Sequence, residues 1–419
     1  MHLRYRQTCR TCGSAALTKV IDLGEQFIQG SFVKEGYESP PMRKIPLQLV
    51  RCDPTRDQSA CGLLQTSVTV PPEILYSTYW YRSGTNRTMR EHLKAIAEKA
   101  VALVGPTPAI ALDVGCNDGT LLACYPDSVE KYGVDPSNAI ESIGKDVVVI
   151  QDRFPSSELT NKIGDRRFDI ITSIAMFYDL EDPIGFVRAV ADVLSPEGVW
   201  IFEMSYMPSM LRTNSYDTIC HEHIEYYSLA AIEFVLSKAG MKLFGAELND
   251  INGGSIRCYA SHDTNFRFRE PELAESLTRL RRLEFDLALD TDKPYRDFQD
   301  QVDAHKNELT RLIKDLKRAG KRVHVYGAST KGNVILQFCG IDNSLIDFAA
   351  DRNPDKWGAR TIGTDIPIIS EDDSREMHPD YYLVLPWHFR SEFVERERET
   401  LRRGTKFIFP LPAIEIVEA

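Results

Sequence analysis

Strand-length apolar runs alternate with longer polar segments over residues 109–204. The runs lie at 109–114, 132–134, 147–150, 168–174 and 199–204. Parallel strands need crossover connections of a dozen or more residues, and the segments between these runs have such lengths. The spacing therefore predicts an α/β fold with a doubly wound parallel sheet. Ligands of such sheets bind at the carboxyl ends of the strands, so the residues after each run are candidates for a site.

The first of these strand ends is a glycine turn. The run includes Asp113, and Gly115, Asn117, Asp118 and Gly119 follow before a helix is expected to begin. The glycines do not have the G-x-G-x-x-G spacing that holds the pyrophosphate of a dinucleotide. Acidic residues on both sides of a glycine turn suit a cationic cofactor that carries an amino acid better than they suit a pyrophosphate.

The later strand ends extend this cofactor site. Asp135 ends the second run, and a carboxylate there can accept hydrogen bonds from both ribose hydroxyls of a nucleoside. The third run leads to Phe154, which is expected to face the adenine. The predicted cofactor residues are Tyr81, Ser83, Asp113, Gly115, Asn117, Asp118, Asp135, Phe154 and Ser173.

Four cysteines near the N-terminus are arranged in pairs. Cys9 and Cys12 form a knuckle with two residues between them, and Cys52 and Cys61 follow roughly forty residues later. Four thiolates satisfy a tetrahedral structural zinc site. The second pair is separated by eight residues, so a loop must bulge between these two ligands. The other five cysteines lie in different patterns and are not expected to bind the metal.

Composition limits the classes of function. A chain of 419 residues is too long for one compact core and predicts two or three domains. The net charge of −11 argues against nonspecific nucleic-acid binding, which needs a basic face. No apolar run approaches the ~20 residues of a membrane span, and the N-terminal residues have no apolar region of a secretory signal. The protein is therefore expected to be cytoplasmic, with its cysteines as thiols or metal ligands.

The densest group of titratable side chains lies at 217–228. This stretch includes His221, Glu222, His223 and Glu225, and it has neither a helical nor a strand period. Packing alone therefore does not explain it, whereas a proton-transfer site does. A polar surface loop is the alternative for the stretch taken by itself.

A second strand, glycine loop and helix are predicted at 322–333. The loop is not a Walker A loop, because no Lys-Ser/Thr pair follows Gly332. Backbone amides at such a helix start can still hold a phosphate, with Lys331 adding a positive charge. Runs near 347–351, 381–385 and 406–409 predict a second doubly wound sheet, and residues 270–318 predict a helical pair before it. The predicted substrate residues are Asn252, Ser329, Lys331 and Asn333.

Together these motifs resemble the class I methyltransferases that use S-adenosylmethionine. The resemblance is closest along Glu203-Met-Ser-Tyr-Met-Pro-Ser-Met-Leu and Asp217-Thr-Ile-Cys-His-Glu-His-Ile-Glu-Tyr-Tyr-Ser, where the chain looks like the C-methyltransferases of unusual deoxysugars. That family modifies nucleotide-linked 4-keto-6-deoxyhexoses, commonly at C-3. The resemblance covers essentially the whole chain. It implies a zinc-binding domain at 1–72, a methyltransferase domain at 73–260 and a C-terminal Rossmann-like α/β domain with a helical bridge at 261–419.

Methyl transfer to carbon needs a base near C-3, a hydrogen-bond donor for the developing enolate oxygen and a sulfonium methyl group in line. His223 is the expected base, because the ordinary pKa of an imidazole lies near neutral pH, and His221 is a second candidate. In the resembling family a Glu-His pair lies beside the reacting sugar, which implies this place for Glu222 and His223. The candidate donors to the enolate are Tyr79, Tyr81, Tyr178 and Tyr226, and Tyr226 and Tyr79 complete the expected catalytic set.

Two other classes of function fit the same motifs. A methyltransferase acting on oxygen or nitrogen needs no carbon acid but can use the same histidine. A noncatalytic zinc-containing protein that binds nucleotide sugars would use the motifs only to hold ligands. The expected ligands of the enzyme are S-adenosylmethionine, a structural zinc ion and a nucleotide-diphosphate sugar. The sequence leaves the nucleotide, the sugar stereochemistry and the oligomeric state open, a monomer included.

Overall fold

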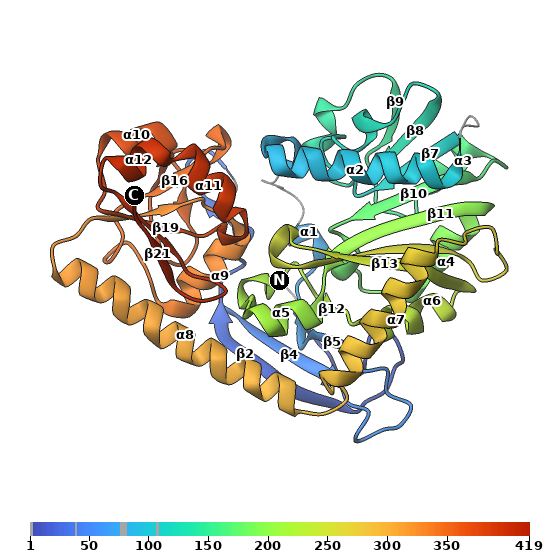
Figure 1. Ribbon diagram of the computed structural model, residues 1–419, viewed down its shortest axis with the longest axis horizontal. Coiled ribbons are helices and arrows are strands. Elements are labelled where there is room, and N and C mark those ends of the chain that lie inside the picture. Colours follow the sequence, from blue (N-terminus) through green and yellow to red (C-terminus); the bar gives the residue numbers. More distant parts are fainter. Residues whose placement is uncertain (1–2, 38–39, 76–81, 106–108) are drawn as a thin grey trace.

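The computed structural model describes residues 3–37, 40–75, 82–105 and 109–419. Its N-terminal strands lie between two larger α/β units, the central one at the right of Figure 1 and the C-terminal one at the left. The N-terminal strands are β1 (Arg4–Tyr5), β2 (Leu17–Gln26), β3 (Phe32–Val33), β4 (Ile45–Cys52), β5 (Leu64–Thr66) and β6 (Val68–Thr69). Strand β4 alternates buried and half-buried residues, because one face of this small sheet covers the core and the other is partly solvated.

The central unit contains a seven-stranded sheet in the order β13-β14-β11-β10-β7-β8-β9. Its strands are β7 (Ala109–Val114), β8 (Val129–Val134), β9 (Val147–Ile150), β10 (Phe168–Ile174), β11 (Leu194–Ser205), β13 (Met241–Asn249) and β14 (Ser255–His262). Strands β7 to β11 pair in parallel, and β14 is inserted antiparallel between β11 and β13. The predicted parallel sheet is confirmed, whereas β13 is not among the predicted strands.

The helices from residue 72 to residue 237 are α1 (Pro72–Leu75), α2 (Arg87–Val104), α3 (Ser157–Ile163), α4 (Pro183–Val193), α5 (Met207–Thr213) and α6 (Leu229–Ser237). Helix α2 begins where Asn86 accepts a hydrogen bond from the backbone N–H of Thr88, and it ends at Gly105. Its buried residues recur at helical spacing and face the sheet, as the sequence period predicts. The glycine turn and Asp135 lie at the carboxyl ends of β7 and β8.

The C-terminal unit has a six-stranded sheet in the order β18-β16-β15-β19-β20-β21. Its strands are β15 (Val323–Tyr326), β16 (Ala349–Asp351), β18 (Ile368–Ser370), β19 (Tyr381–Val384), β20 (Lys406–Phe409) and β21 (Glu415–Val417), and its helices are α9 (Thr330–Cys339), α10 (Glu371–Glu376), α11 (Arg390–Arg396) and α12 (Arg398–Arg402). The strand order reverses between β15 and β19, which is where ligands bind in sheets of this kind.

Two long helices join the larger units. Helix α7 (Pro271–Asp286) packs on β13, and α8 (Lys293–Arg318) packs on β2, α9 and β15. Strand β3 also pairs with β17 (Arg360–Thr361) of the C-terminal unit. The N-terminal domain therefore contacts both larger units.

One apolar core connects the three parts of the chain. It includes Leu47 of β4, Met207 of α5, Tyr216 and Ile219 before the histidines, and Val325 of β15. In Figure 1, α5 and β12 (Glu225–Tyr226) lie between the two larger units, above β2 and β4. Burial of this shared apolar surface holds the units in a fixed arrangement.

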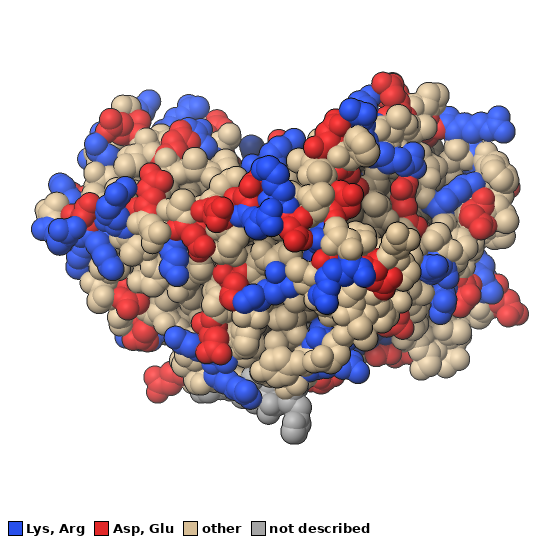
Figure 2. All heavy atoms as spheres, turned by 90° about the horizontal axis from the view of Figure 1, so that it is seen from below, with Lys and Arg blue, Asp and Glu red and all other residues tan. Residues whose placement is uncertain are grey.

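The surface carries mixed charges. On the face in Figure 2, acidic and basic side chains are interspersed and do not form one basic patch. Among the described residues, no helix combines the length and the apolar character that crossing a membrane requires.

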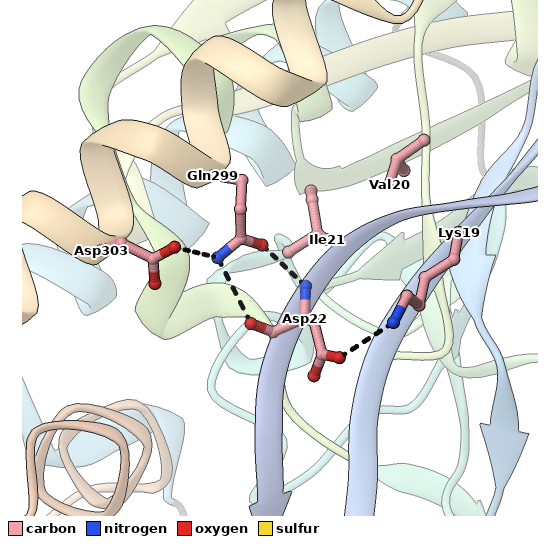
Figure 3. A pocket seen from close by; sticks show the side chains of 6 residues that line it. All are labelled: Lys19, Val20, Ile21, Asp22, Gln299 and Asp303. Atoms are coloured by element: carbon pink, nitrogen blue, oxygen red, sulfur yellow. Dashed lines mark hydrogen bonds and ion pairs between the residues drawn. The ribbon is translucent and has the colours of Figure 1, made fainter.

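An open groove of about 360 Å³ lies where α8 packs on β2 (Figure 3). The side-chain amide of Gln299 bonds the backbone N–H of Asp22 at 2.7 Å and its carbonyl at 3.3 Å, as a neighbouring strand would. Gln299 thereby covers part of the free edge of β2. None of the residues that line the groove belongs to the stretch 217–228.

Candidate active site

The stretch 217–228 passes from the central unit into the N-terminal sheet. It begins in a short 3-10 helix (Tyr216–Thr218) and continues into β12, which pairs antiparallel with β5. Every residue from 215 to 229 except His223 is buried. The stretch is therefore not a polar surface loop. The stretch has neither a helical nor a strand period because its polar side chains are held by contacts to other parts of the chain.

His223 is a neutral imidazole with one ring nitrogen fixed. Its Nδ1 lies 2.9 Å from the backbone oxygen of Thr218. A carbonyl oxygen can only accept, so Nδ1 carries the hydrogen and Nε2 keeps the lone pair of a base. Burial lowers the pKa of His223 to about 3, with the charge of Lys331 adding to the effect, so the lone pair is present at neutral pH.

His221 has the same tautomer in a more enclosed place. Its Nδ1 lies 2.9 Å from Oε1 of Gln29, and its backbone N–H donates to the same oxygen at 3.2 Å. Burial lowers the pKa of His221 to about 4. Its side chain is only 2% exposed, and Nε2 has no hydrogen-bond partner among the described residues. His223 is less enclosed than His221, which favours His223 as the base that meets a substrate.

Glu222 packs on the N-terminal domain. Its carboxyl group lies so close to Gly30 that a Cβ atom there would collide with Oε1 and lie 2.7 Å from Cδ. Burial raises the pKa of Glu222 to about 7.

The tyrosines differ in what they can donate. The hydroxyl of Tyr226 donates to the backbone oxygen of His223 at 2.9 Å, and a phenol has only one hydrogen to donate. This bond holds the turn that carries His223, and the catalytic role expected for Tyr226 stays a prediction. The ring of Tyr178 packs against His223, with centroids 4.2 Å apart. Tyr79 and Tyr81 lie outside the described residues.

The glycine turn of the central sheet is held against the residues before α2. The side chain of Asn117 accepts from the backbone N–H of Ser83 at 3.1 Å, and Asp118 accepts from that of Gly84 at 2.8 Å. Asn117 has a left-handed φ of 49°, and Gly115 has one of 76°. The structure brings four predicted cofactor residues, Ser83, Gly115, Asn117 and Asp118, together around one turn.

Two carboxyl groups beside this turn fit a cationic nucleoside. Burial raises the pKa of Asp113 to about 7, and the nearby Asp135 raises it further, while a hydrogen bond from Thr172 opposes the rise. A bound ammonium or sulfonium group would stabilise both carboxylates. Asp135 already accepts from Asn117 N and from the backbone and hydroxyl of Ser137. A carboxylate has about four acceptor positions, so one remains for a ribose hydroxyl without rearrangement.

The two remaining predicted cofactor residues differ in exposure. Phe154 is half-buried, with its ring edge-on to Phe186 at 5.3 Å, and it keeps a face available at the end of β9. Ser173 has no exposed surface, and its hydroxyl accepts from the indole N–H of Trp200 at 3.2 Å inside the core. The Ser173 side chain is thus enclosed in the core, and a role for this residue in cofactor binding stays a prediction. Position 173 lies one residue before the end of β10, so its side chain faces the packed side of the sheet.

The start of α9 closes another side of the site. Nζ of Lys331 donates to the backbone oxygen of Asn252 at 2.6 Å, which joins the two larger units. Burial lowers the pKa of Lys331, while the charge of Asp217 opposes this effect. Since the charge of Lys331 also lowers the pKa of His223, the ammonium group lies within electrostatic reach of the base.

Ser329 and Asn333 have different roles at this helix start. The hydroxyl of Ser329 caps α9 by accepting from the backbone N–H of Gly332 at 3.0 Å. The amide of Asn333 donates to the backbone oxygen of Gln29 at 2.7 Å and is 1% exposed. The structure thus brings Ser329, Lys331 and Asn333 together at the start of α9, where the two larger units meet. At this junction Asn333 bonds the N-terminal domain.

Several residues at the junction were not identifiable from the sequence. Asp217 is fully buried and accepts from the indole N–H of Trp387 at 2.8 Å, across the two larger units. Gln29 and Gly30 contact His221 and Glu222. Asp217 opens the dense stretch, which is a signal for it, but no local pattern marks Gln29, Gly30 or Trp387.

The four N-terminal cysteines form one cluster. Their sulfur atoms all lie within 4.8 Å of one another, with Cys9 3.5 Å from Cys61 and Cys12 3.4 Å from Cys52. Sulfur atoms held at about 2.3 Å from one tetrahedral zinc ion lie about 3.8 Å apart, so the quartet fits the metal. The long spacing is absorbed by a compact turn in which Asp53 accepts from Thr55 and bonds Thr18 and Arg51. None of the nine cysteines forms a disulfide.

The cysteine knuckle contacts the strand that follows His223. Arg10, between the first two cysteines, donates to the backbone oxygens of Thr66 at 3.2 Å and Ile224 at 3.4 Å. Its side chain is fully buried. The order of the metal site is therefore coupled to β12 and to the turn that carries His223.

Family models match three successive parts of the chain. The model described as "Putative zinc binding domain" matches residues 9–76, "Methyltransferase domain" matches 81–244 and "C-methyltransferase C-terminal domain" matches 250–412. The C-methyltransferase NovU of Streptomyces niveus is 27% identical over 417 residues, which cover 98% of this chain and 97% of NovU. The chain is therefore similar to C-methyltransferases over nearly its whole length.

Solved structures resemble part of this C-methyltransferase. An S-adenosylmethionine-dependent methyltransferase from Clostridium acetobutylicum is 14% identical, with a TM-score of 0.32, over 41% of this chain and 92% of that one. The magnesium protoporphyrin IX methyltransferase of Synechocystis is 13% identical, with a TM-score of 0.30, over 41% of this chain and 79% of that one.

These matches decide between the classes that the motifs leave open. They confirm that the chain is an S-adenosylmethionine-dependent C-methyltransferase, with an N-terminal zinc-binding domain that contains the cysteine cluster. A noncatalytic sugar-binding protein and transfer to oxygen or nitrogen are thereby set aside.

Proposed function

We propose that the enzyme transfers the methyl group of S-adenosylmethionine to C-3 of a nucleotide-linked 4-keto-6-deoxyhexose. The observation that carries this proposal is the state of His223, an imidazole with Nδ1–H held by a backbone carbonyl and a free lone pair on Nε2. Transfer to carbon needs a base of this kind, because a carbon nucleophile must first lose a proton. The proposed sugar substrate is inferred from the motifs around this histidine, which resemble those of the sugar C-methyltransferases.

The ketone at C-4 makes the hydrogen on C-3 acidic, and Nε2 of His223 removes it. The bound cofactor supplies an electrophilic methyl group. With a pKa of about 3, His223 is a weak base, and the positive charge of Lys331 contributes to this low pKa. An anionic substrate beside Lys331 would offset this charge and raise the basicity of His223. Tyr178, which packs against the imidazole, is the candidate donor to the enolate oxygen among the described residues.

The cofactor is held at the carboxyl ends of β7 and β8. Asp135 accepts a ribose hydroxyl, and Asp113 with the Gly115 turn faces the amino-acid end. The adenine lies toward Phe154. This arrangement directs the methyl group toward the stretch 217–228, which follows β11 of the same sheet.

Asp135→Ala is expected to weaken S-adenosylmethionine binding about 10- to 150-fold, because a hydrogen bond to a charged group contributes ~1.5–3 kcal/mol. Isothermal titration calorimetry measures the effect. Asp127→Ala, which removes an exposed carboxylate from the same sheet unit, should bind normally. Unchanged affinity in Asp135→Ala would refute the ribose assignment.

The diphosphate of the substrate lies between the two larger units, at the start of α9. Helix N-termini attract anions, and Lys331 adds a charge next to this end. Ser329 and the carbonyl region of Asn252 border the same place, and Asn333 keeps α9 against Gln29.

Lys331→Ala is expected to raise the KM for the nucleotide sugar about 10- to 150-fold, for the loss of ~1.5–3 kcal/mol from a charged hydrogen bond. Steady-state kinetics at saturating cofactor give this value. Lys314→Ala, an exposed position on α8, is the control and should leave KM unchanged. If KM stays at the wild-type value in Lys331→Ala, the phosphates bind elsewhere.

The function itself is tested with a panel of 4-keto-6-deoxy nucleotide sugars and S-adenosylmethionine. Mass spectrometry detects the added methyl group, and NMR identifies the carbon that carries it. A methyl group on oxygen, or no product from any member of the panel, would refute the proposed substrate. We place the reaction in the cytoplasm, since nine cysteines without a disulfide fit a reducing compartment.

A further inference from the structure

The turn after β2 brings two residues of the N-terminal domain to the catalytic stretch. Gln29 is 1% exposed, and its Oε1 accepts from both the backbone N–H and Nδ1–H of His221. Its Nε2 donates to Oε1 of Gln26 at 2.9 Å. Because the backbone N–H of His221 can only donate, the orientation of the Gln29 amide is fixed, and the amide holds the residue just before Glu222.

Gly30 follows Gln29 and lies beneath the carboxyl group of Glu222. A Cβ atom at position 30 would collide with Oε1 and lie 3.3 Å from Oε2 of the same carboxyl group. The φ angle of Gly30 is outside the left-handed region, so its backbone conformation suits other residues too. What requires glycine at position 30 is therefore space for Glu222.

The same turn is fixed from the opposite side by α9. Asn333 donates to the backbone oxygen of Gln29 at 2.7 Å. Gln337, one helical turn later, accepts from the backbone N–H of Phe27 at 2.8 Å and donates to its oxygen at 3.3 Å. The turn is thus held between α9 and the catalytic stretch, and movement of one is transmitted to the other.

We propose that the N-terminal domain forms one wall of the active site, with Gln29 and Gly30 as positioning residues for His221 and Glu222. The inference rests on the proposed function only in the role given to the Glu-His pair. Gln29 fixes the backbone before Glu222. The space left by Gly30 determines the position of the Glu222 carboxylate relative to the bound sugar. The zinc-binding domain thereby has a part in methyl transfer besides stabilising the fold.

The test is a double-mutant cycle of wild type, Gly30→Ala, Glu222→Asp and the double variant. The Cβ methyl group of alanine at position 30 displaces the Glu222 carboxylate. In Gly30→Ala kcat is therefore expected to fall about tenfold or more, an effect in the range seen for coupled residues in contact. The dissociation constant of S-adenosylmethionine and the fraction of cofactor-binding protein should stay at wild-type values. In the Glu222→Asp background, the shorter side chain leaves room for alanine, and the second substitution should lower kcat less than about twofold.

Two further variants separate positioning from general damage to the domain. Ser31→Ala changes the next residue without adding volume and should keep the wild-type kcat. Gln29→Leu has similar size but lacks the acceptor for His221, and it should lower kcat with cofactor binding retained. A wild-type kcat in Gly30→Ala, or an equal loss in both backgrounds, would overturn the proposal.

The same four proteins are also compared by chemical denaturation. Non-additive free energies of unfolding are expected, because Gly30 and Glu222 are in contact. Additive values would overturn the proposal even if the wild type methylates no nucleotide sugar. A wild type without such activity would instead refute the proposed substrate, so the two failures are distinguishable.

Discussion

His223→Asn is expected to lower kcat by about 10²–10⁴-fold, the usual effect of losing a general base. Asparagine can still donate to the backbone oxygen of Thr218, which keeps the side chain in place, but its amide does not accept a proton near neutral pH. Binding of S-adenosylmethionine should persist, since Asp135 and the glycine turn are unchanged. The rate is measured at saturating substrate, and a thermal melt establishes folding.

His221→Asn is the matched control, because it makes the same substitution two residues earlier. An effect below about tenfold is expected, since His221 is enclosed and does not act as the base. Exchange of the C-3 hydrogen with solvent gives a second readout, which should be lost only in His223→Asn. An inactive His221→Asn beside an active His223→Asn would show that the base is misassigned by two residues. If both variants remain active, a tyrosine or water takes the proton.

Cys52→Ser is expected to abolish zinc binding and unfold the N-terminal domain. Zinc binding to four thiolates contributes ~10–16 kcal/mol of apparent free energy in small zinc domains. Cys52 is fully buried at the end of β4, which belongs to the same sheet as β12. Activity should therefore be lost as well, because β12 and Arg10 hold the turn of His223. Metal analysis, thermal melts and methyl-transfer rates give the three readouts.

Cys124→Ser is the control for the zinc variant. Cys124 lies outside the metal cluster and donates to the backbone oxygen of Thr120, which a serine hydroxyl can also do. This variant should keep about one zinc ion per chain. Wild-type protein with much less than one zinc ion per chain, or a Cys52→Ser protein that keeps its zinc, would contradict the assignment.

The sequence by itself determined the features that depend on neighbouring residues. Apolar runs of strand length predict the central parallel sheet, because burial on both faces requires nearly continuous apolar residues. The glycine turn at 115–119 and Asp135 follow their strands directly, so their place at the sheet edge could be predicted. The cysteine pairs also predict the metal cluster, because tetrahedral zinc limits the residue types that can surround it.

Only the tertiary structure decided the features that depend on contacts between distant residues. The hydroxyl of Tyr226 donates to the backbone oxygen of His223, a contact that no local pattern marks. Ser173 lies in β10, and its hydroxyl bonds the indole N–H of Trp200 in the core.

The wall made by Gln29 and Gly30 could not be predicted either. These residues are separated from His221 by about 190 positions, and no period or motif marks them. They meet the catalytic stretch because one apolar core draws the N-terminal sheet, residues 216–226 and the C-terminal sheet together. Burial of apolar surface has no sequence direction, so it brings together polar groups that local patterns do not connect.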